Sequence, residues 1–184
     1  LHYKLEHQKF DLVLVSDNDA LSFVLDFRNT LLLNTPIVFC GINNYQPESL
    51  DPYSGITGVA EYPSYRETID YALRFDPSTR KVVVIGYTRN MTGRANREMF
   101  SEAASYFNDV VFEYWDDLPI DELTEKLKTL SKGTVLFING SITERSGRIL
   151  SNSQSASQIK KASEVPLYSM WDFYLGDGIV GGKL

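Results

Sequence analysis

The sequence predicts an α/β protein in which parallel sheets are flanked by helices. Two observations support this: short apolar runs rich in branched residues alternate with amphipathic stretches, and the alternation repeats along most of the 184 residues. Repeated β-α units favour parallel strands, because each helix returns the chain to the start of the next strand. A strand-like link near residue 58 precedes a second set of units. We therefore expect two lobes, a first at 1–58 and a second at 59–170, with 171–184 returning toward the first.

The expected elements follow from the spacing of apolar residues. Strands are expected at 11–16, 36–40, 81–86, 110–114, 134–138 and 165–168, with a weaker one at 56–59. Helices are expected at 21–32, 64–73, 92–106, 119–130 and 153–162. Asp17 or Asp19 can cap the first of these helices, and Ser64 with Glu67 has the spacing of a capping box before the second.

Composition excludes several classes of function. The formal net charge of −6 disfavours a nucleic-acid partner, because phosphates demand clustered Lys and Arg. No apolar run approaches the roughly 20 residues that span a bilayer, so we expect this part of the protein to be soluble. A single cysteine and two histidines exclude a disulfide framework and leave little for His-based catalysis. We expect no metal and no cofactor, and we expect Cys40, which ends an apolar strand, to be a buried thiol.

The candidate binding residues follow the strands, because ligands of parallel α/β sheets meet the loops at the carboxyl ends of strands. Those loops are rich in Asn, Asp, Thr, Ser and aromatic residues, which suits a polar small molecule. The expected ligand-binding residues are Asp17, Asn18, Asn43, Glu61, Thr88, Asn139 and Trp171. The two carboxylates would accept hydrogen bonds, the amides and the threonine would orient the ligand, and the indole would pack against it. The alternative is that such residues only cap helices and make turns. No nucleophile–base pair is visible, so no catalytic residue is expected.

Four segments carry a resemblance to a known family. They are SDNDA at 16–20, PIVFCGIN at 36–43, GITGVAE at 55–61 and WDFYLGDGIVGG at 171–182. Together they resemble the substrate-binding proteins of ABC transporters, with the type I periplasmic-binding-protein fold. They are more similar still to the form used as the extracytoplasmic sensor region of bacterial membrane histidine kinases. Relative to that family, the first βα units of the first lobe and the C-terminal helices are missing, so we expect a fragment with a truncated first lobe.

The resemblance implies a function and a location. It implies a two-lobe fold that binds a small molecule between the lobes, and relatives in the transporter branch bind ligands that include aromatic amino acids. The first hypothesis is an extracytoplasmic sensing domain of a histidine kinase whose parent protein is anchored in a membrane. The alternative is the substrate-binding component of an ABC transporter, and an α/β enzyme is a third hypothesis. Whether the domain forms a homodimer stays open.

Overall fold

The computed structural model describes residues 2–50 and 53–183, and it divides the chain into two compact units. Unit 1 is Leu1–Tyr62 and unit 2 is Pro63–Leu184, so the segment that follows residue 170 is grouped with unit 2. Each unit has its own parallel sheet, with one hydrophobic core in unit 1 and two in unit 2 among the described residues. The predicted fold class, parallel sheets flanked by helices, is confirmed.

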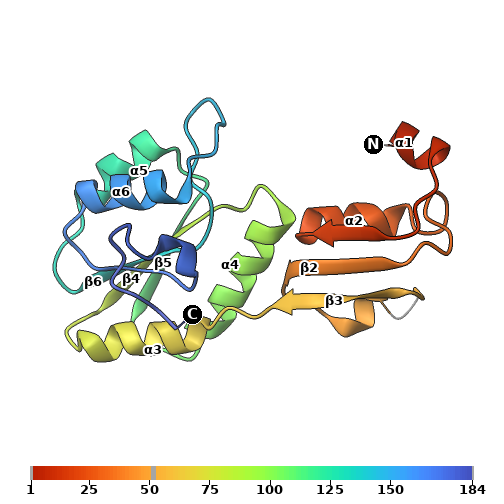
Figure 1. The fold of residues 1–184 in the computed structure, drawn as a ribbon. Coiled ribbons are helices and arrows are strands. Elements are labelled where there is room, and N and C mark those ends of the chain that lie inside the picture. Colours follow the sequence, from red (N-terminus) through yellow and green to blue (C-terminus); the bar gives the residue numbers. More distant parts are fainter. Residues whose placement is uncertain (1, 51–52, 184) are drawn as a thin grey trace. The chain divides into compact units, whose positions relative to one another are not determined.

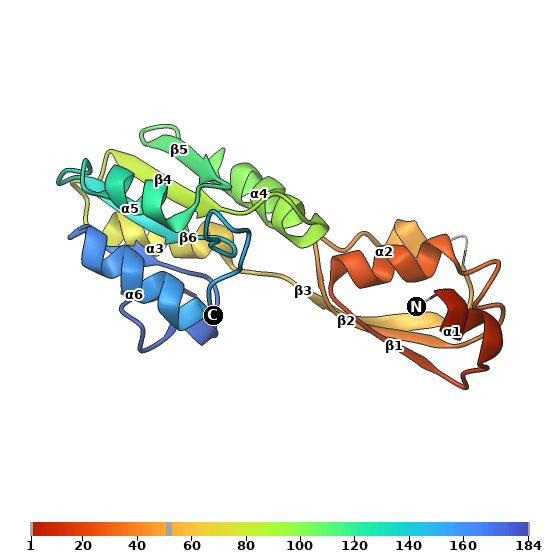
Figure 2. The same cartoon turned by 90° about the horizontal axis from the view of Figure 1, so that it is seen from above.

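Unit 1 is built on a sheet of three parallel strands in the order β1-β2-β3. Its elements are α1 (His2–His7), β1 (Val13–Ser16), α2 (Asn18–Asp26), β2 (Ile37–Asn43), the 3-10 helix η1 (Pro47–Leu50) and β3 (Ile56–Glu61). Figure 2 shows the three strands side by side with α2 across one face. Leu21 and Val24 of α2 pack there against Val15, Ile37 and Phe39 of the sheet. Burial of these side chains holds the helix on the sheet.

The opposite face of the unit 1 sheet carries exposed apolar side chains. Leu14 is 76 % exposed and Val59 is 71 % exposed. The register pairs Ser16 with Cys40 and Cys40 with Val59, which places the thiol on this same face. Cys40 is exposed, so the prediction of a buried thiol is wrong. The apolar run of β2 predicted that both faces of the strand are buried. Instead, α2 covers only the face that carries Ile37 and Phe39, and Cys40 lies on the other face.

Helix α2 ends earlier than the apolar spacing predicts, and the side chain of Arg28 bonds to the turns that follow it. Arg28 is 6 % exposed, and its guanidinium donates hydrogen bonds to the carbonyl oxygens of Leu32 at 2.5 Å, Thr35 at 2.6 Å and Ser54 at 2.7 Å. A chain of turns replaces the expected helix beyond Asp26. Arg28 therefore fixes the loop before β2 and ties it to the loop before β3.

Unit 2 is built on a sheet of four parallel strands in the order β5-β4-β6-β7. Its strands are β4 (Lys81–Gly86), β5 (Val111–Asp116), β6 (Thr134–Ile138) and β7 (Leu167–Tyr168). Its helices are α3 (Tyr65–Phe75), α4 (Met91–Ala104), α5 (Ile120–Leu127), α6 (Asn152–Ala162) and the 3-10 helix η2 (Asp172–Tyr174). Figure 1 shows α5 and α6 on one side of this sheet and α3 on the other. Both faces are therefore covered, as parallel sheets require.

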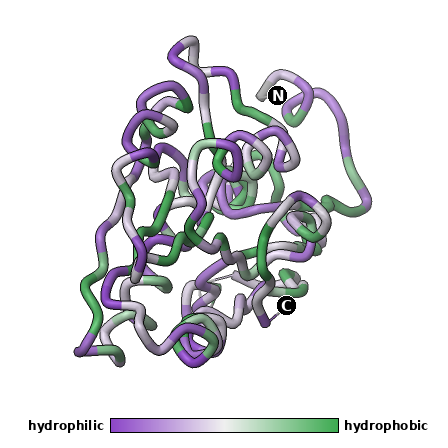
Figure 3. The backbone as a smooth tube through the Cα atoms, turned by 90° about the vertical axis from the view of Figure 1, so that its left-hand side faces the viewer, coloured by the Kyte–Doolittle hydropathy of each residue, from purple (hydrophilic) through white to green (hydrophobic). Residues whose placement is uncertain are grey.

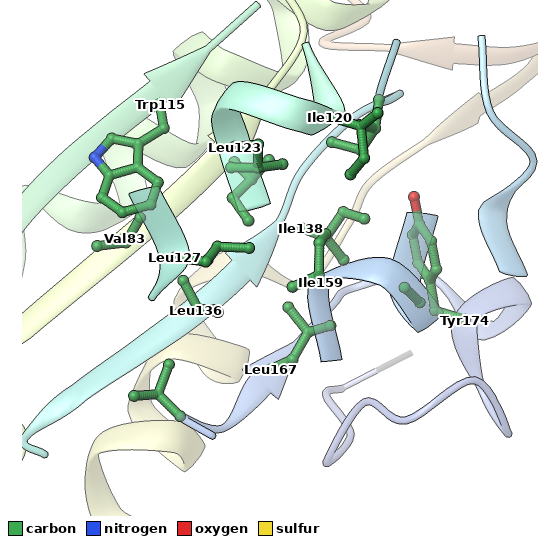
Figure 4. Packing of buried hydrophobic residues seen from close by; sticks show 14 of the residues in the cluster. Val83, Trp115, Ile120, Leu123, Leu127, Leu136, Ile138, Ile159, Leu167 and Tyr174 are labelled. Carbon is green, nitrogen blue, oxygen red and sulfur yellow. The ribbon is translucent and has the colours of Figure 1, made fainter. Parts of the chain in front are cut away.

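The two faces of the unit 2 sheet belong to two different cores. Val83 of β4 packs in a cluster with Leu123 of α5 and Ile159 of α6, which Figure 4 shows from close by. Val84, the next residue, packs in the other cluster with Phe100 of α4 and with α3. Successive strand residues point to opposite faces, so the continuous apolar run of β4 fills both cores.

The helices are amphipathic, as their apolar spacing predicts. Along the coils in Figure 3 the hydropathy changes between hydrophilic and hydrophobic within single turns. The expected capping box is wrong, because Ser64 makes no side-chain cap at α3. A capping box is instead present at α6, where Ser151 and Gln154 bond reciprocally. Within the described ranges, no helix is both long and apolar enough to cross a membrane.

Candidate functional site

The carboxyl edge of the unit 1 sheet joins three of the predicted residues in one hydrogen-bonded row. The register of β2 on β3 shifts between Cys40 and Ile42, and this shift places Asn43 opposite Glu61. Asn43 is 2 % exposed, and its Nδ2 donates to Oε2 of Glu61 at 3.0 Å. The bond holds one oxygen of an exposed carboxylate in place at the end of β3.

Asn18 completes this row from the first turn of α2. Its Nδ2 donates to the carbonyl oxygen of Asn43 at 2.8 Å, and its Oδ1 accepts from the N–H of Asn43 at 2.9 Å. The side chain of Asn18 therefore replaces a neighbouring strand for this stretch of main chain. Because β1 ends at Ser16, no ladder partner from β1 reaches Asn43.

Asp17 lies beside this row and acts at the start of α2. Its side chain accepts a hydrogen bond from the N–H of Asn18 at 2.7 Å, which makes it the N-cap. The backbone of Asp17 has φ of 77°, a conformation that L-residues rarely adopt and that Asp tolerates better than most. The predicted cap is confirmed, and the exposed carboxylate lies at the end of β1.

In unit 2, Thr88 follows β4 and is held by a residue that sequence reasoning did not select. The N–H of Thr88 donates to Oδ1 of Asp117 at 2.9 Å, and its hydroxyl donates to Oδ2 at 2.5 Å. Asp117 follows β5 and has φ of 59°. Arg89 lies 3.7 Å from the same carboxylate. Thr88 is therefore fixed in orientation, and its hydroxyl oxygen can still accept a hydrogen bond.

Asp116, the last residue of β5, lies over the main chain of β4. Its Oδ2 accepts from Nε of Arg97 at 3.1 Å, and the guanidinium lies 3.1 Å from the centroid of the Tyr114 ring. Its Oδ1 is buried and accepts no hydrogen bond within the described chain. A Cβ on Gly86 would come within 2.2 Å of that oxygen, so the close approach requires glycine at this position.

Asn139 follows β6 and is 1 % exposed. Its N–H donates to the carbonyl oxygen of Ile85 at 2.8 Å, and its Nδ2 donates to the carbonyl oxygen of Asn96 in α4 at 3.2 Å. The Oδ1 atoms of both Asn139 and Asn96 are buried, and neither accepts a hydrogen bond from the residues that the structure describes. Leaving such an acceptor without a donor costs about 1–3 kcal/mol, so each of these atoms calls for an explanation.

Trp171 follows β7 and packs mainly against the protein itself. Its ring meets the edge of the Tyr65 ring at 6.2 Å and stacks on Phe173 at 6.0 Å, both between centroids. It is partly buried and contacts both cores of unit 2. The side chain therefore anchors the segment after β7 to α3, and part of its surface stays open.

The structure thus brings Asn18, Asn43 and Glu61 together, whereas Thr88, Asn139 and Trp171 each bind a different neighbour. Sequence reasoning missed Asp116, Asp117 and Asn96. Asp116 ends β5 and Asp117 follows it, so the rule that selected the other residues could have found both. Asn96 lies inside α4, where no strand-end rule applies. Within 2–50 and 53–183, no group of three His, Cys, Asp or Glu residues could hold a metal ion.

These groups are acceptors and donors for hydrogen bonds, and they form two separate edges, one in each unit. No protein-family model matches the sequence, and a search of curated proteins finds no match. A search of solved structures does find matches. A conserved domain protein from Vibrio cholerae has a TM-score of 0.67 at 10 % identity, over 94 % of this chain and 58 % of that one.

Of two further matches, one is a complex with a ligand and the other is a ligand-binding receptor. An ABC domain from Streptococcus pneumonia in complex with L-Trp has a TM-score of 0.67 at 13 % identity, over 94 % of this chain and 57 % of that one. An extracellular ligand-binding receptor from Verminephrobacter eiseniae has a TM-score of 0.53 at 14 % identity, over 91 % of this chain and 46 % of that one. This chain therefore spans less than two thirds of each of the three structures.

At these identities the likeness concerns the fold. The fold is of the periplasmic-binding-protein-like α/β type, with two parallel sheets. In fold, the chain is similar to structures of a substrate-binding protein and of a ligand-binding receptor.

Proposed function

We propose that this chain is a ligand-binding module for a polar small molecule rather than an enzyme. The observation that carries the proposal is the set of buried oxygens at the carboxyl edge of the unit 2 sheet. Oδ1 of Asp116, Oδ1 of Asn139 and Oδ1 of Asn96 accept no hydrogen bond within the described chain. Native proteins leave few buried acceptors without a donor. A ligand that donates N–H or O–H groups at this edge would supply the missing bonds.

The carboxyl edge of unit 1 supports the proposal with a second set of groups. Glu61 is held by Asn43 through one oxygen, and its second oxygen can accept a hydrogen bond from a ligand. Asp17 adds a carboxylate at the end of β1. In this proposal a ligand that bonds to both units at once favours one arrangement of the units over the others. The change in the populations of these arrangements is what would report that the ligand is bound.

The finer proposal is the sensor role. In this proposal the chain is the extracytoplasmic sensing domain of a membrane-anchored histidine kinase. The segments at 16–20, 36–43, 55–61 and 171–182 support it, because they resemble the sensor form of the family. The alternative, a substrate-binding component of an ABC transporter, is supported by the same fold. The flanking gene sequence separates them: transmembrane segments and a kinase core favour the sensor, and a lipoprotein signal favours the transporter.

The test is a thermal-shift screen of amino acids, carboxylates and sugars, since ligand binding raises the apparent stability. A hit should lose its shift in the variants Glu61→Gln and Asn139→Asp. The matched control is Asn108→Ala, which changes an exposed side chain of unit 2. Hits that survive both site variants would overturn the assignment of the site. Turnover in a hydrolase and transferase screen would favour the enzyme hypothesis.

A further inference from the structure

A hollow in unit 2 lies away from the carboxyl edge of the sheet. It has a volume of about 940 Å³ and lies where α5 and α6 end and where β6 and β7 begin. Four lysines line it: Lys128, Lys132, Lys160 and Lys161. The volume falls within the range of small-molecule pockets, roughly 300–1,000 Å³. In a chain with a net charge of −6, so many cations around one hollow call for a reason.

Three of these lysines differ from the other Lys and Arg residues that the structure describes in unit 2. Within the described part of unit 2, each remaining lysine and arginine contacts a carboxylate, a carbonyl oxygen or an aromatic ring. Lys132, Lys160 and Lys161 have no such partner there, and all three line this hollow. Lys128 does have a partner, because its Nζ lies 2.5 Å from Oε1 of Glu125.

Helix dipoles account for part of this pattern. Lys160 and Lys161 lie in the last turn of α6, where cations are favoured by the partial negative charge of the helix end. That effect explains their place in the sequence. It does not explain why Lys132, which lies in the loop after α5, lines the same hollow without an ion pair to any described residue.

The two acidic groups of the hollow neutralise these lysines only in part. Asp76 is occupied by Ser78, whose N–H and hydroxyl donate to Oδ1 at 3.0 and 2.6 Å, and these bonds lower the pKa of the Asp76 carboxyl. Glu164 is the other carboxylate of the lining. Within the described chain, three ammonium groups without an ion pair against these two carboxylates leave the hollow with a net positive charge, which attracts an anion.

The loop that carries Lys132 is held in place. The carbonyl oxygen of Gly133 accepts hydrogen bonds from the N–H groups of Arg80 at 2.8 Å and Lys81 at 3.2 Å. Gly133 itself has φ of +80°, which favours glycine. The hydroxyls of Ser131 and Ser163 also line the hollow and can donate to an anion.

From this arrangement we propose that the hollow between the ends of α5 and α6 binds a dianionic oxyanion, phosphate or a phosphate monoester, through Lys132, Lys160 and Lys161. Lysine binds phosphate as a point charge, and three such charges around one hollow match a dianion better than a single carboxylate. The site is separate from the proposed ligand edge and does not depend on it.

The test is calorimetric titration of the full 184-residue chain at constant ionic strength, first with inorganic phosphate and then with methyl phosphate. Each of Lys132→Gln, Lys160→Gln and Lys161→Gln should weaken binding about two- to fivefold, as expected for exposed charge pairs. Lys128→Gln makes the same charge change at a paired lysine and should have a smaller effect. Glu164→Gln removes one of the two opposing charges and should tighten binding.

The results separate the sources of the anion and can overturn the proposal. Tighter binding of methyl phosphate than of phosphate indicates a phosphorylated small molecule, and the reverse order indicates free phosphate. The proposal is overturned if chloride at the same ionic strength gives the same heat. It is also overturned if Lys128→Gln weakens binding as much as Lys132→Gln, since the effect would then come from the overall electrostatic potential of the surface and not from contacts of the three lysines.

Discussion

The side chain of Asn18 and the main chain of Asn43, 25 residues apart, are joined by two hydrogen bonds in opposite directions. One bond uses the amide nitrogen of Asn18 and the other its oxygen. The pair fixes the angle at which α2 leaves β1 relative to the end of β2. It also fixes Asn43, whose own side chain holds Glu61.

Replacing Asn18 by Ala should therefore destabilise unit 1. Two lost hydrogen bonds at a partly buried position correspond to about 2 kcal/mol in the free energy of unfolding. Both tryptophans of the chain lie in unit 2, so urea unfolding should be followed by NMR of the β1–β3 amides. Asn29→Ala, at an exposed position, should change the free energy by less than about 0.5 kcal/mol. Equal effects of the two variants would contradict this prediction.

Substitution of Arg28 should destabilise unit 1 even when the new residue is lysine. Its planar guanidinium serves three carbonyl oxygens that a single ammonium group on a different stem does not match. Arg28→Lys should lower the free energy of unfolding of unit 1 by about 2–3 kcal/mol, in the same NMR-detected urea titration. Arg28→Met, which removes all donors, should cost more. A lysine variant as stable as the wild type would show that the three bonds contribute nothing.

Gly86→Ala should disturb the carboxylate of Asp116. The new methyl group would come within 2.2 Å of Oδ1, and overpacking of this kind costs about 1–3 kcal/mol. The shift should also break the bond from Arg97. A double-mutant cycle with Asp116→Ala, measured by tryptophan fluorescence of unit 2 in urea, gives the control. The cost of Gly86→Ala should be smaller when Asp116 is absent, and an unchanged cost would place the strain elsewhere.

The carboxylate of Glu113 should make unit 2 sensitive to acid. A hydrogen bond from Lys81 and a weaker one from the Trp115 indole lower the pKa of Glu113 below its ordinary value of 4.5. A lowered pKa in the folded state means that the ionised form stabilises the fold above that ordinary value. This stabilisation should be lost as the pH falls below 4.5.

The measurement is the urea midpoint of unit 2 as a function of pH, for the wild type and for Glu113→Gln. The difference between the two midpoints should be largest near neutral pH and should shrink as the pH falls below 4.5. A difference that does not depend on pH would contradict the assignment to ionised Glu113.

Cys40 should react in the folded protein. Its thiol is exposed on the face of the unit 1 sheet opposite α2, so a disulfide reagent should label the native chain at nearly the rate seen in urea. Cys40→Ser should leave the free energy of unfolding almost unchanged. Protection of the thiol in the native state would show that this face is covered in solution.

The apolar runs predicted the strands well, because an apolar strand can be recognised from its own residues. The end of α2 could not be predicted in this way. The turns that replace the helix beyond Asp26 accompany contacts of Arg28 with residues as far as Ser54, and no local pattern shows such a contact. The exposure of Cys40 was not predicted for a related reason. The run around Cys40 is apolar on both faces, and its burial depends on what covers each face.

The candidate site was predictable to the extent that it follows strand ends. Asn18, Asn43 and Glu61 were selected by that rule, but their bonding to one another depends on the register shift at Gly41, which the sequence does not show. Asn96 was not predicted as a site residue because it lies inside α4, and the rule that selected the other residues applies only to strand ends. Its importance comes only from the carbonyl oxygen that Asn139 contacts across the sheet edge.

Because successive side chains of β4 point to opposite faces, the unit 2 sheet separates two hydrophobic layers that can be changed independently. Val83 and Val84 are consecutive, yet one packs with α5 and α6 and the other with α4 and α3. An engineer can therefore enlarge or trim one layer by substituting every second strand residue while the other layer keeps its packing. Reporter groups at these two neighbouring positions would follow events on opposite sides of the sheet.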